Sequence, residues 1–332
     1  MQPTIDVVAL GNALVDVLSY EDDAFVNAVG IERGAMTMVD LERSDEIYAA
    51  MGPGTEISGG SAANTVAGVA GFGGRACFVG KVRDDQLGRV FRHDLRSIGV
   101  SFDTPAAADG LPTGRCLVVV TPDAQRTMST YLGIAPDIRP EDVDAETITS
   151  AAVTYLEGYL WDRPEAKAAI VKASEIARGA GRRVAFTLSD PFCVDRHRDE
   201  FWDLVGTHVD ILFANDVEVR ALTEADDFDE ALQAVRGRCD IAVLTRSEHG
   251  SVVVAGDEVH VVAAHPVEAV VDTTGAGDLY AAGFLYGVTH GHDLHTCARL
   301  GGAAAAEVIG HLGARPVTPL RAFAAEILGD GG

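Results

Sequence analysis

The most informative stretch of this 332-residue sequence is Val270-Val271-Asp272-Thr273-Thr274-Gly275-Ala276-Gly277-Asp278. A run with helical spacing of apolar residues follows it, so we expect a helix over residues 278–290. The small residues at 275–277 let the backbone turn tightly and point successive N–H groups at one place. The N-terminus of a helix favours negative charge at that place. The stretch therefore predicts an anion site, with Asp278 beside it in the first helical turn.

A simpler interpretation makes Asp278 a helix cap and the glycines an ordinary turn. The order D-T-T-G-A-G-D at the start of a helix favours a functional role instead. The stretch lacks the G-K-[ST] of a Walker A loop, and it is not a G-x-G-x-x-G placed after a first strand.

Strand-like and helix-like segments alternate through most of the chain. Short apolar, β-branched runs predict buried strands at 5–10, 76–82, 153–156, 183–188, 209–214 and 241–245. Helical spacing predicts helices at 61–71, 86–98, 164–179, 229–236, 278–290 and 294–309. This alternation is typical of a three-layer α/β/α fold with a mostly parallel central sheet.

Two regions interrupt the alternation, at residues 15–40 and 103–132. The second contains a predicted hairpin, 116–120 and 126–132 around a turn at 121–125, and another hairpin is expected at 250–264. We expect the two interruptions to form a small antiparallel β lid. Residues 1–14, 41–102 and 133–332 would then make the large nucleotide-binding domain.

Composition excludes several classes of partner. The chain has 50 acidic residues against 26 Lys and Arg, a net charge of −24, which argues against nucleic acid and against an anionic membrane surface. Five scattered cysteines form no C-x-x-C pair, which favours reduced thiols over a zinc site. Asp6 interrupts the only apolar run near the start, so no signal peptide is expected and we predict a cytoplasmic protein.

The D-T-T-G-A-G-D stretch resembles the C-terminal signature of the ribokinase-like carbohydrate kinases, also called the phosphofructokinase-B family. The family's N-terminal signature is recognisable too, as Gly59-Gly60-Ser61-Ala62-Ala63-Asn64-Thr65. The resemblance covers essentially the whole chain. It implies ATP-dependent phosphoryl transfer to a hydroxymethyl group, with ATP and Mg²⁺ as cofactors.

The resemblance also implies roles for the residues of the phosphate loop. Asp278 would be the general base that accepts the hydroxyl proton, and Gly275, Ala276 and Gly277 would form the anion hole. Thr274 would contact the nucleotide. Because Asp278 would lie at a helix N-terminus, we expect its pKa to be low.

Two further motifs imply nucleotide and metal contacts. Asn215 and Glu218 match the family's N-x-x-E motif, in which Glu218 would act on Mg²⁺ indirectly. An Asn cap with an exposed Glu is the simpler alternative. Thr245, Ser247 and Gly250 align with a T-x-G-x-x-G segment that contacts the nucleotide. Ser247 stands where the first Gly is usual, so the preferred nucleotide is open.

Polar residues after the first predicted strand suggest the acceptor. Asp16 could accept hydrogen bonds from the 2′- and 3′-hydroxyls of a ribose, with Asn12, Asn64, Gly60 and Ser61 nearby. The G-N-x-L-x-D form of this segment is similar to adenosine kinases. So are the segments 125–132 and 189–192.

This similarity favours adenosine as the acceptor, phosphorylated on its 5′-hydroxyl. Arg126 would reach the phosphates when the lid closes. An apolar pocket for a purine would be formed by side chains of the lid and of strand ends, namely Met36, Met38, Met128, Tyr159 and Phe192.

Two alternatives stay open on the sequence. One is a ribokinase- or fructokinase-like sugar kinase, and the other is a nucleoside or nucleotide sensor without efficient catalysis. The sequence leaves monomer and homodimer equally open. A monovalent-cation site, common in relatives, would be sought at Asp272 and at residues 304–313.

Overall fold

A nine-stranded sheet forms the body of the protein. The computed structural model describes residues 2–123 and 125–329, so Ala124 in the predicted 121–125 turn lies outside the described residues. The strands lie in the order β14-β13-β12-β11-β10-β9-β1-β5-β6. Their bounds are Glu258–Val262, Ser251–Ala255, Ile241–Thr245, Ile211–Asn215, Arg183–Thr187, Ala151–Glu157, Ile5–Leu10, Ala76–Val79 and Val100–Ser101. All neighbouring pairs are parallel except β12–β13 and β13–β14.

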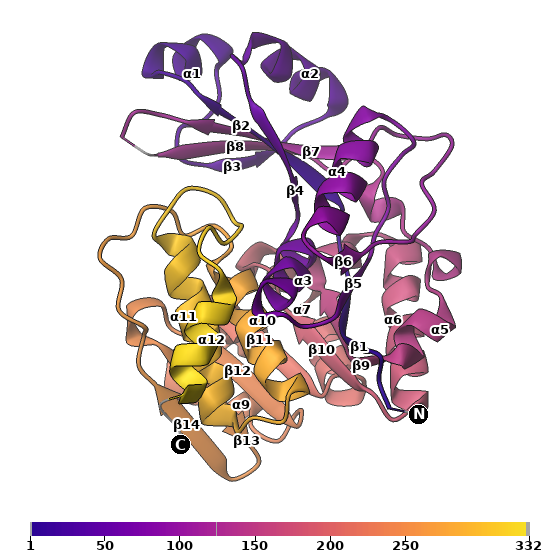
Figure 1. Ribbon diagram of the computed structural model, residues 1–332, viewed down its shortest axis with the longest axis vertical. Helices are drawn as coiled ribbons and strands as arrows, with labels where there is room; N and C mark the ends of the chain where they lie inside the picture. The colour runs from indigo at the N-terminus through magenta and orange to yellow at the C-terminus, as the bar shows by residue number, and fades with distance from the viewer. Residues whose placement is uncertain (1, 124, 330–332) are drawn as a thin grey trace.

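Helices cover both faces of this sheet (Figure 1). One face carries α3 (Ser61–Phe72), α4 (Gln86–Ser97), α10 (Ala276–Thr289), α11 (Leu294–Ile309) and α12 (Leu320–Gly329). The other carries α5 (Ala145–Ser150), α6 (Pro164–Gly179), α7 (Pro191–Thr207), α8 (Asp216–Thr223) and α9 (Phe228–Val235). Short 3-10 helices lie at Ala135–Asp137 (η1), Pro140–Asp142 (η2), Gly158–Asp162 (η3) and Ser247–His249 (η4).

The central strands are apolar throughout because each contributes to two cores. In β1, Val7 and Ala9 pack against the α3–α10 side, whereas Val8 and Leu10 pack against the α6–α7 side. Burial on both faces is the reason these strands show no alternation of apolar and polar residues. The predicted three-layer architecture is therefore present.

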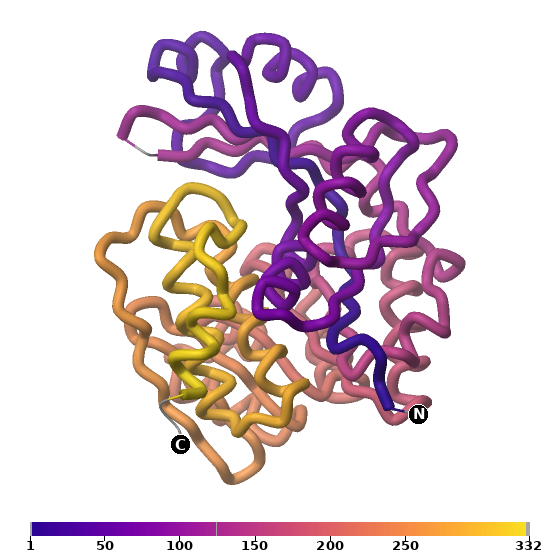
Figure 2. The backbone as a smooth tube through the Cα atoms, in the orientation of Figure 1, coloured from indigo at the N-terminus to yellow at the C-terminus, as the bar shows by residue number. Residues whose placement is uncertain are grey.

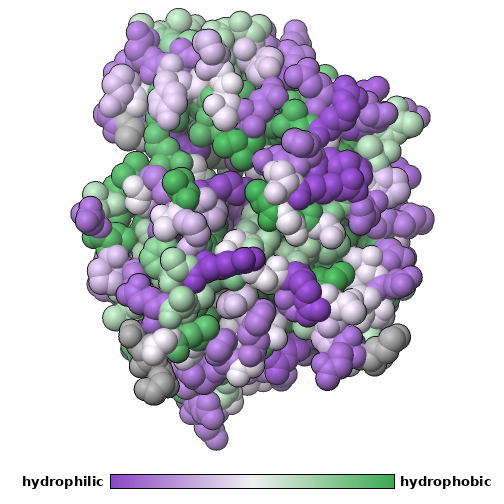
Figure 3. All heavy atoms as spheres, in the orientation of Figure 1, coloured by the Kyte–Doolittle hydropathy of each residue, from purple (hydrophilic) through white to green (hydrophobic). Residues whose placement is uncertain are grey.

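A second sheet of five strands lies beside the body, in the order β3-β8-β7-β2-β4. Its strands are β2 (Leu14–Tyr20), β3 (Met36–Met38), β4 (Thr55–Gly59), β7 (Gly114–Val120) and β8 (Arg126–Tyr131). With α1 (Asp23–Val29) and α2 (Leu41–Ala50) it forms the separate upper lobe in Figure 1. We call this sheet with its two helices the lid. The space-filling view shows the lid set off from the body (Figure 3).

The lid differs from the prediction in two ways. α2 and β4 belong to it, although we assigned residues 41–102 wholly to the large domain. The sheet is also mixed rather than antiparallel, since β2–β7 and β3–β8 are parallel pairs. The first difference arises because β4 runs antiparallel to β2 on its way to α3, and the second because β2 and β3 pair with β7 and β8, which are distant in the sequence; local sequence patterns reveal neither pairing.

The predicted strands and helices agree with the structure to within a few residues at their ends. β5 stops at Val79 rather than at residue 82, and β11 begins at Ile211 rather than at 209. The two hairpins form as expected, β7–β8 in the lid and β13–β14 at the edge of the body. The tube in Figure 2 shows the N-terminal end in the lower part of the body, away from the lid.

The turn between β12 and β13 contains an unusual backbone. Ser247, which replaces the usual glycine, has φ 49°, and Gly250 has φ 78° and ψ −130°. A Cβ atom on Gly250 would lie 2.0 Å from the carbonyl oxygen of Val262. Ser247 thus adopts the left-handed conformation that glycine favours, while only glycine fits at 250.

We therefore expect Gly250→Ala to lower the free energy of unfolding by about 2 kcal/mol or more, because the new Cβ is strained and collides with backbone. Urea unfolding at pH 7 measures this change. The control is Ser247→Gly, which relieves a left-handed serine and should change stability by less than about 1 kcal/mol. A Gly250→Ala protein as stable as the parent would contradict the conclusion that only glycine fits at position 250.

Candidate active site

The phosphate loop has the conformation that the sequence predicts. Gly275 has φ 80° and forms the N-cap of α10, which runs from Ala276 to Thr289. Ala276 N–H is bonded to the Thr273 carbonyl and Leu279 N–H to the Gly275 carbonyl. Among the backbone hydrogen bonds of the described residues, none satisfies the N–H groups of Gly275, Gly277 or Asp278.

The space beside these N–H groups is open. A Cβ atom built on Gly277 would meet no heavy atom within 4 Å. Unbonded N–H groups at a helix N-terminus, next to open space, form an anion-binding arrangement.

Asp278 is held by two side chains from the N-terminal signature. Ser61 Oγ donates to Asp278 Oδ1 at 2.6 Å, and Asn64 Nδ2 donates to Oδ2 at 2.9 Å. Residues from the two ends of the chain thus meet at one carboxylate, where α3 and α10 pack side by side. The N-terminal signature, assigned to the acceptor, therefore also orients Asp278.

The expectation of a low pKa for Asp278 is wrong. Burial raises its pKa above the ordinary value, although the hydrogen bonds from Ser61 and Asn64 and the charge of Arg315 oppose that shift. The dipole at a helix N-terminus favours the ionised carboxylate, but the loss of hydration in the folded protein has the larger effect on its pKa.

Glu157 is a buried carboxyl that the sequence analysis missed. It lies at the end of β9, 1% exposed, and accepts hydrogen bonds from Asn12 Nδ2 at 2.8 Å and from Ala62 N–H at 3.0 Å. Burial raises its pKa to about 7. An acidic residue directly after the apolar run 153–156, at the carboxyl edge of a parallel sheet, is the signal that could have revealed it.

Two buried amide oxygens lack a partner in this region. Asn12 and Asn64 are 3% and 5% exposed, and their Oδ1 atoms make no hydrogen bond within the described part of the chain. Each amide NH₂ is already bonded to a carboxylate, Glu157 or Asp278. The carboxylates therefore fix the orientation of both amides, so that each Oδ1 atom can accept a hydrogen bond from another donor.

Asp16 lies on β2 beside this group, where the lid meets the body. It pairs in register with Ile57 of β4 and Cys116 of β7. A Cβ atom on Gly59 would be 2.5 Å from the Asp16 carboxylate, so only glycine admits it. Burial raises the pKa of Asp16 to about 6. Gly60 completes the corner with φ 94°, against the carbonyl of Asn12.

A small cleft of about 80 Å³ connects Asp278 with the predicted nucleotide side. Its lining includes Ser61, Gly277 and Asp278, together with Asn215, Glu218 and Thr245. Asn215 and Glu218 form a capping box for α8, with Glu218 Oε1 accepting from Asn215 Nδ2 at 2.6 Å. Glu218 is 7% exposed, not the exposed side chain of the simpler alternative, and burial raises its pKa to about 7.

Arg126 does not lie free for a phosphate in this structure. Its guanidinium forms an ion pair with Asp272, and both side chains are nearly buried. Asp272 also accepts hydrogen bonds from Thr274 N–H at 3.0 Å and Gly313 N–H at 2.9 Å. The lid strand β8 is thereby attached to the segment that leads into the phosphate loop.

The predicted apolar pocket is not assembled. Met38 is 52% exposed on the edge strand β3, and Phe192 is 76% exposed at the start of α7. Met36, also half exposed, pairs in register with Met128. Tyr159 turns instead toward Ser189, to whose carbonyl its hydroxyl donates at 3.3 Å. These side chains do not enclose a ligand in this structure.

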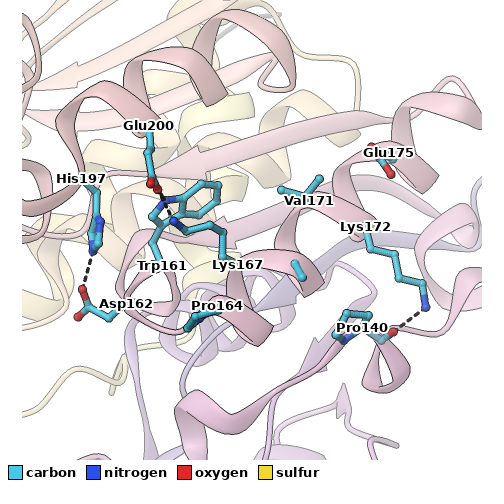
Figure 4. Close-up of a pocket in the computed structure, with 11 residues that line it drawn as sticks. Pro140, Trp161, Asp162, Pro164, Lys167, Val171, Lys172, Glu175, His197 and Glu200 are labelled. Atoms are coloured by element: carbon cyan, nitrogen blue, oxygen red, sulfur yellow. Dashed lines mark hydrogen bonds and ion pairs between the residues drawn. The ribbon is translucent and has the colours of Figure 1, made fainter.

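A larger cavity of about 520 Å³ lies elsewhere, on the outer side of α6 and α7 (Figure 4). None of the predicted site residues lines it. Two pairs of its polar side chains bond to each other, Lys167 to Glu200 and His197 to Asp162, and Lys172 donates to the Pro140 and Val143 carbonyls. It is a surface groove distinct from the site around Asp278.

The known proteins that are similar to this chain are kinases. The family model described as pfkB family carbohydrate kinase matches residues 35–321. An adenosine kinase from Sinorhizobium meliloti of known structure is 50% identical, over 97% of this chain and 99% of that one, with TM-score 0.90. A probable sugar kinase from Rhizobium etli is 48% identical, over 99% of both chains, with TM-score 0.90.

A third relative has a different acceptor in its name. An ATP-dependent ribose-1-phosphate kinase from Halopiger xanaduensis is 33% identical, over 80% of this chain and 85% of its own length. In the part of the chain that the structure describes, no helix is both long and apolar enough to cross a membrane. The fold and the matched family confirm the ribokinase-like architecture and a phosphotransferase that acts on a hydroxyl group. This chain belongs to the pfkB family of carbohydrate kinases, which includes sugar and nucleoside kinases.

Proposed function

We propose that this protein transfers the terminal phosphoryl group of ATP to the 5′-hydroxyl of a ribonucleoside, with adenosine as the preferred acceptor. The observation that carries the reaction is the set of unbonded N–H groups at Gly275, Gly277 and Asp278, with the Asp278 carboxylate beside them. The choice of adenosine is supported by the 50% identity to an adenosine kinase.

In this mechanism Asp278 accepts the proton of the attacking hydroxyl. The free N–H groups of Gly275, Gly277 and Asp278 stabilise the charge on the transferring phosphoryl group, whereas the Ala276 N–H, expected in the same anion hole, is bonded to the Thr273 carbonyl. Phosphoryl transfer depends on position and charge more than on a strong base. A carboxylate held by Ser61 and Asn64 meets that need, because its orientation is fixed before the acceptor binds.

The acceptor would be held by side-chain oxygens that accept hydrogen bonds. The unbonded Oδ1 atoms of Asn12 and Asn64 each accept from an O–H group, and Asp16 accepts from a vicinal diol. A nucleoside supplies such hydroxyls on its ribose. The base would be covered when Met38 and Met128 of the lid approach Tyr159 and Phe192, and Arg126 would then exchange Asp272 for phosphate.

The charge of this corner favours a neutral acceptor. Three carboxyl groups, Asp16, Asp278 and Glu157, stand against the single charge of Arg315, which acts on the first two, and Arg126 is already paired with Asp272. An acceptor that carries its own phosphate, such as the ribose 1-phosphate named for one relative, would bring further negative charge to them. We therefore favour a nucleoside, and after it a neutral sugar, over a sugar phosphate.

The nucleotide would lie along Thr245, Ser247, Gly250 and Thr274. Magnesium supplies charge neutralisation between the phosphates when bound. Among the described residues there is no cluster of three His, Cys, Asp or Glu side chains for a metal ion. Both oxygens of Glu218 accept hydrogen bonds from Asn215, so Glu218 fits an indirect role, through metal-bound water. A cytoplasmic location accompanies this proposal.

We expect Asp278→Asn to lower kcat by about three orders of magnitude, because an amide cannot accept the hydroxyl proton. The variant should unfold at pH 7 with no loss of stability. Burial raises the pKa of Asp278, so the ionised carboxylate is less favourable in the folded than in the unfolded protein. Steady-state kinetics and urea unfolding of one preparation test both statements. Near-normal turnover would remove Asp278 as the base.

We expect the acid limb of the kcat/KM profile to move to higher pH in Ser61→Ala. The Ser61 hydroxyl lowers the pKa of Asp278, so its loss raises that pKa further. As the pH falls, the Asp278 carboxylate of the variant then becomes protonated at a higher pH than that of the parent. Ser97→Ala, which removes an exposed hydroxyl on α4, is the matched control and should leave the limb unchanged. Coincident profiles for Ser61→Ala and the parent would contradict the proposal that Asp278, held by the Ser61 hydroxyl, is the base that sets the acid limb.

An acceptor screen with ATP and Mg²⁺ tests the proposed specificity. Adenosine should give the highest kcat/KM, above inosine, ribose, fructose and ribose 1-phosphate, with ADP and AMP formed in equal amounts. Preference for ribose or fructose would favour the sugar-kinase alternative. Absence of ADP with every acceptor would favour a sensor without efficient catalysis.

A further inference from the structure

Arg315 lies in the loop between α11 and α12 and contacts the corner where β4 ends and α3 begins. Its Nε and Nη2 atoms donate to the Ser58 carbonyl at 3.1 and 2.7 Å, and Nη2 also donates to Ser58 Oγ at 3.0 Å. Its Nη1 atom donates to the Ala63 carbonyl at 2.9 Å. The side chain thus joins the C-terminal part of the chain to the connection between the lid and the body.

The same corner is held from a third side by Asp94 of α4. Asp94 Oδ2 accepts from Ser58 N–H at 2.8 Å and from Ser58 Oγ at 2.5 Å. Arg315 itself contacts no carboxylate in any ion pair or hydrogen bond of residues 2–123 and 125–329. Within the described segments, the Arg315 guanidinium hydrogen-bonds only to neutral oxygens, so its positive charge acts on the nearby carboxylates of Asp94, Asp16 and Asp278 without a direct ion pair.

Both acidic groups of the site lie against this corner. The Asp16 carboxylate touches Gly59, the residue after Ser58. The Asp278 carboxylate is bonded to Asn64, the residue after Ala63. Arg315 therefore binds the carbonyls of Ser58 and Ala63, and the residue after each of them in the chain contacts one of the two carboxylates. Arg126, the other cation near Asp16, is already paired with Asp272.

The charge of Arg315 favours the ionised form of both carboxyl groups, and their charges favour its protonated form. Arg315 lowers the pKa of Asp16 and that of Asp278 against the larger effect of burial, which raises both. Burial lowers the pKa of Arg315 to about 10, opposed by the charges of Asp94, Asp16 and Asp278. Arg315 is therefore still protonated at neutral pH.

Other groups face the two carboxylates from the surrounding elements. Asp16 is also near Cys116, Arg126 and Asp278. Asp278 is also faced by Ser61, Asn64, Tyr155, Glu157, Tyr159 and Glu218. Arg126 and Arg315 both act on Asp16, but of these two cations only Arg315 also acts on Asp278.

We propose that Arg315 is a positioning residue for phosphoryl transfer. It fixes the β4–α3 corner from the C-terminal loop and supplies the positive charge that keeps Asp16 and Asp278 ionised together. The inference rests on the proposed function for the roles of Asp16 and Asp278. It extends that function by assigning the pH range of activity to a side chain that need not touch either substrate.

The test compares Arg315→Met, Arg315→Gln and Arg315→Lys with the parent. Arg92→Met is the matched control, because Arg92 also donates to backbone carbonyls, those of Phe102 and Thr104, but does so away from the site. The acid limb of kcat/KM should move up by about one pH unit in the Met and Gln variants. In Arg315→Lys it should stay near that of the parent, since the charge is kept while the forked hydrogen bonds are lost.

A purely structural role predicts a different pattern. All three Arg315 variants, and Arg92→Met, would then lose thermal stability with the acid limb unmoved, and that result would overturn the proposal. An equal shift in the Lys and Met variants would overturn it too. Gln keeps a donor for the Ser58 carbonyl, so it serves as the neutral variant if Arg315→Met does not fold.

A second measurement separates this inference from the proposed function. The carboxyl carbons of ¹³C-labelled aspartate are titrated by NMR, with Asp16 and Asp278 assigned through Asp16→Asn and Asp278→Asn. Both pKa values should rise in Arg315→Gln and remain unchanged in Arg92→Met. If no acceptor is phosphorylated, the proposed function fails, yet this titration still tests Arg315. Unchanged pKa values in Arg315→Gln would refute its role as the shared counter-charge.

Discussion

The contact of Asp278 with Ser61 and Asn64 is the interaction on which the site depends. It joins the first turn of α10 to the first turn of α3, two helices that pack on the same face of the central sheet. The Asp278 carboxylate is thereby fixed relative to the unbonded N–H groups at the start of α10. Oriented dipoles of this kind act on a developing charge without having to reorganise.

Fixing this carboxylate has an electrostatic cost, since burial disfavours its ionised form. The surrounding structure opposes that effect with donors on one side and the charge of Arg315 on another. Glu157 and Glu218, each with a pKa raised to about 7, lie in the same region. A concentration of perturbed carboxyl groups around one cleft is typical of a site built for function rather than for stability.

Much of the fold could be predicted because the local patterns agree with the global architecture. The apolar run of β1 and the helical spacing of α6 and α11 are strong signals, and each is present over the expected residues. The membership of β4 in the lid could not be predicted, because a short, mostly polar strand carries little periodicity and its partner β2 is distant in the sequence. The ends of β5 and β11 differ by two or three residues, where turns compete with strand pairing.

The site was predictable where residue types are tied to a motif, and less so where only tertiary packing brings groups together. The loop at Gly275 and the caps at Asn215 follow from sequence order. The bonds from Ser61 and Asn64 to Asp278, the pairing of Arg126 with Asp272 and the position of Arg315 depend on how distant segments meet. The raised pKa of Asp278 shows the same limit, because hydration is lost only in the assembled fold.

The most direct test of the account is a crystal structure with ADP, Mg²⁺, adenosine and a fluoride analogue of the transferring phosphoryl group. The account predicts the analogue within about 3 Å of the N–H groups of Gly277 and Asp278, with the acceptor hydroxyl about 3 Å from the Asp278 carboxylate. An analogue bound away from the start of α10, or an acceptor whose hydroxyl faces another side chain, would contradict it.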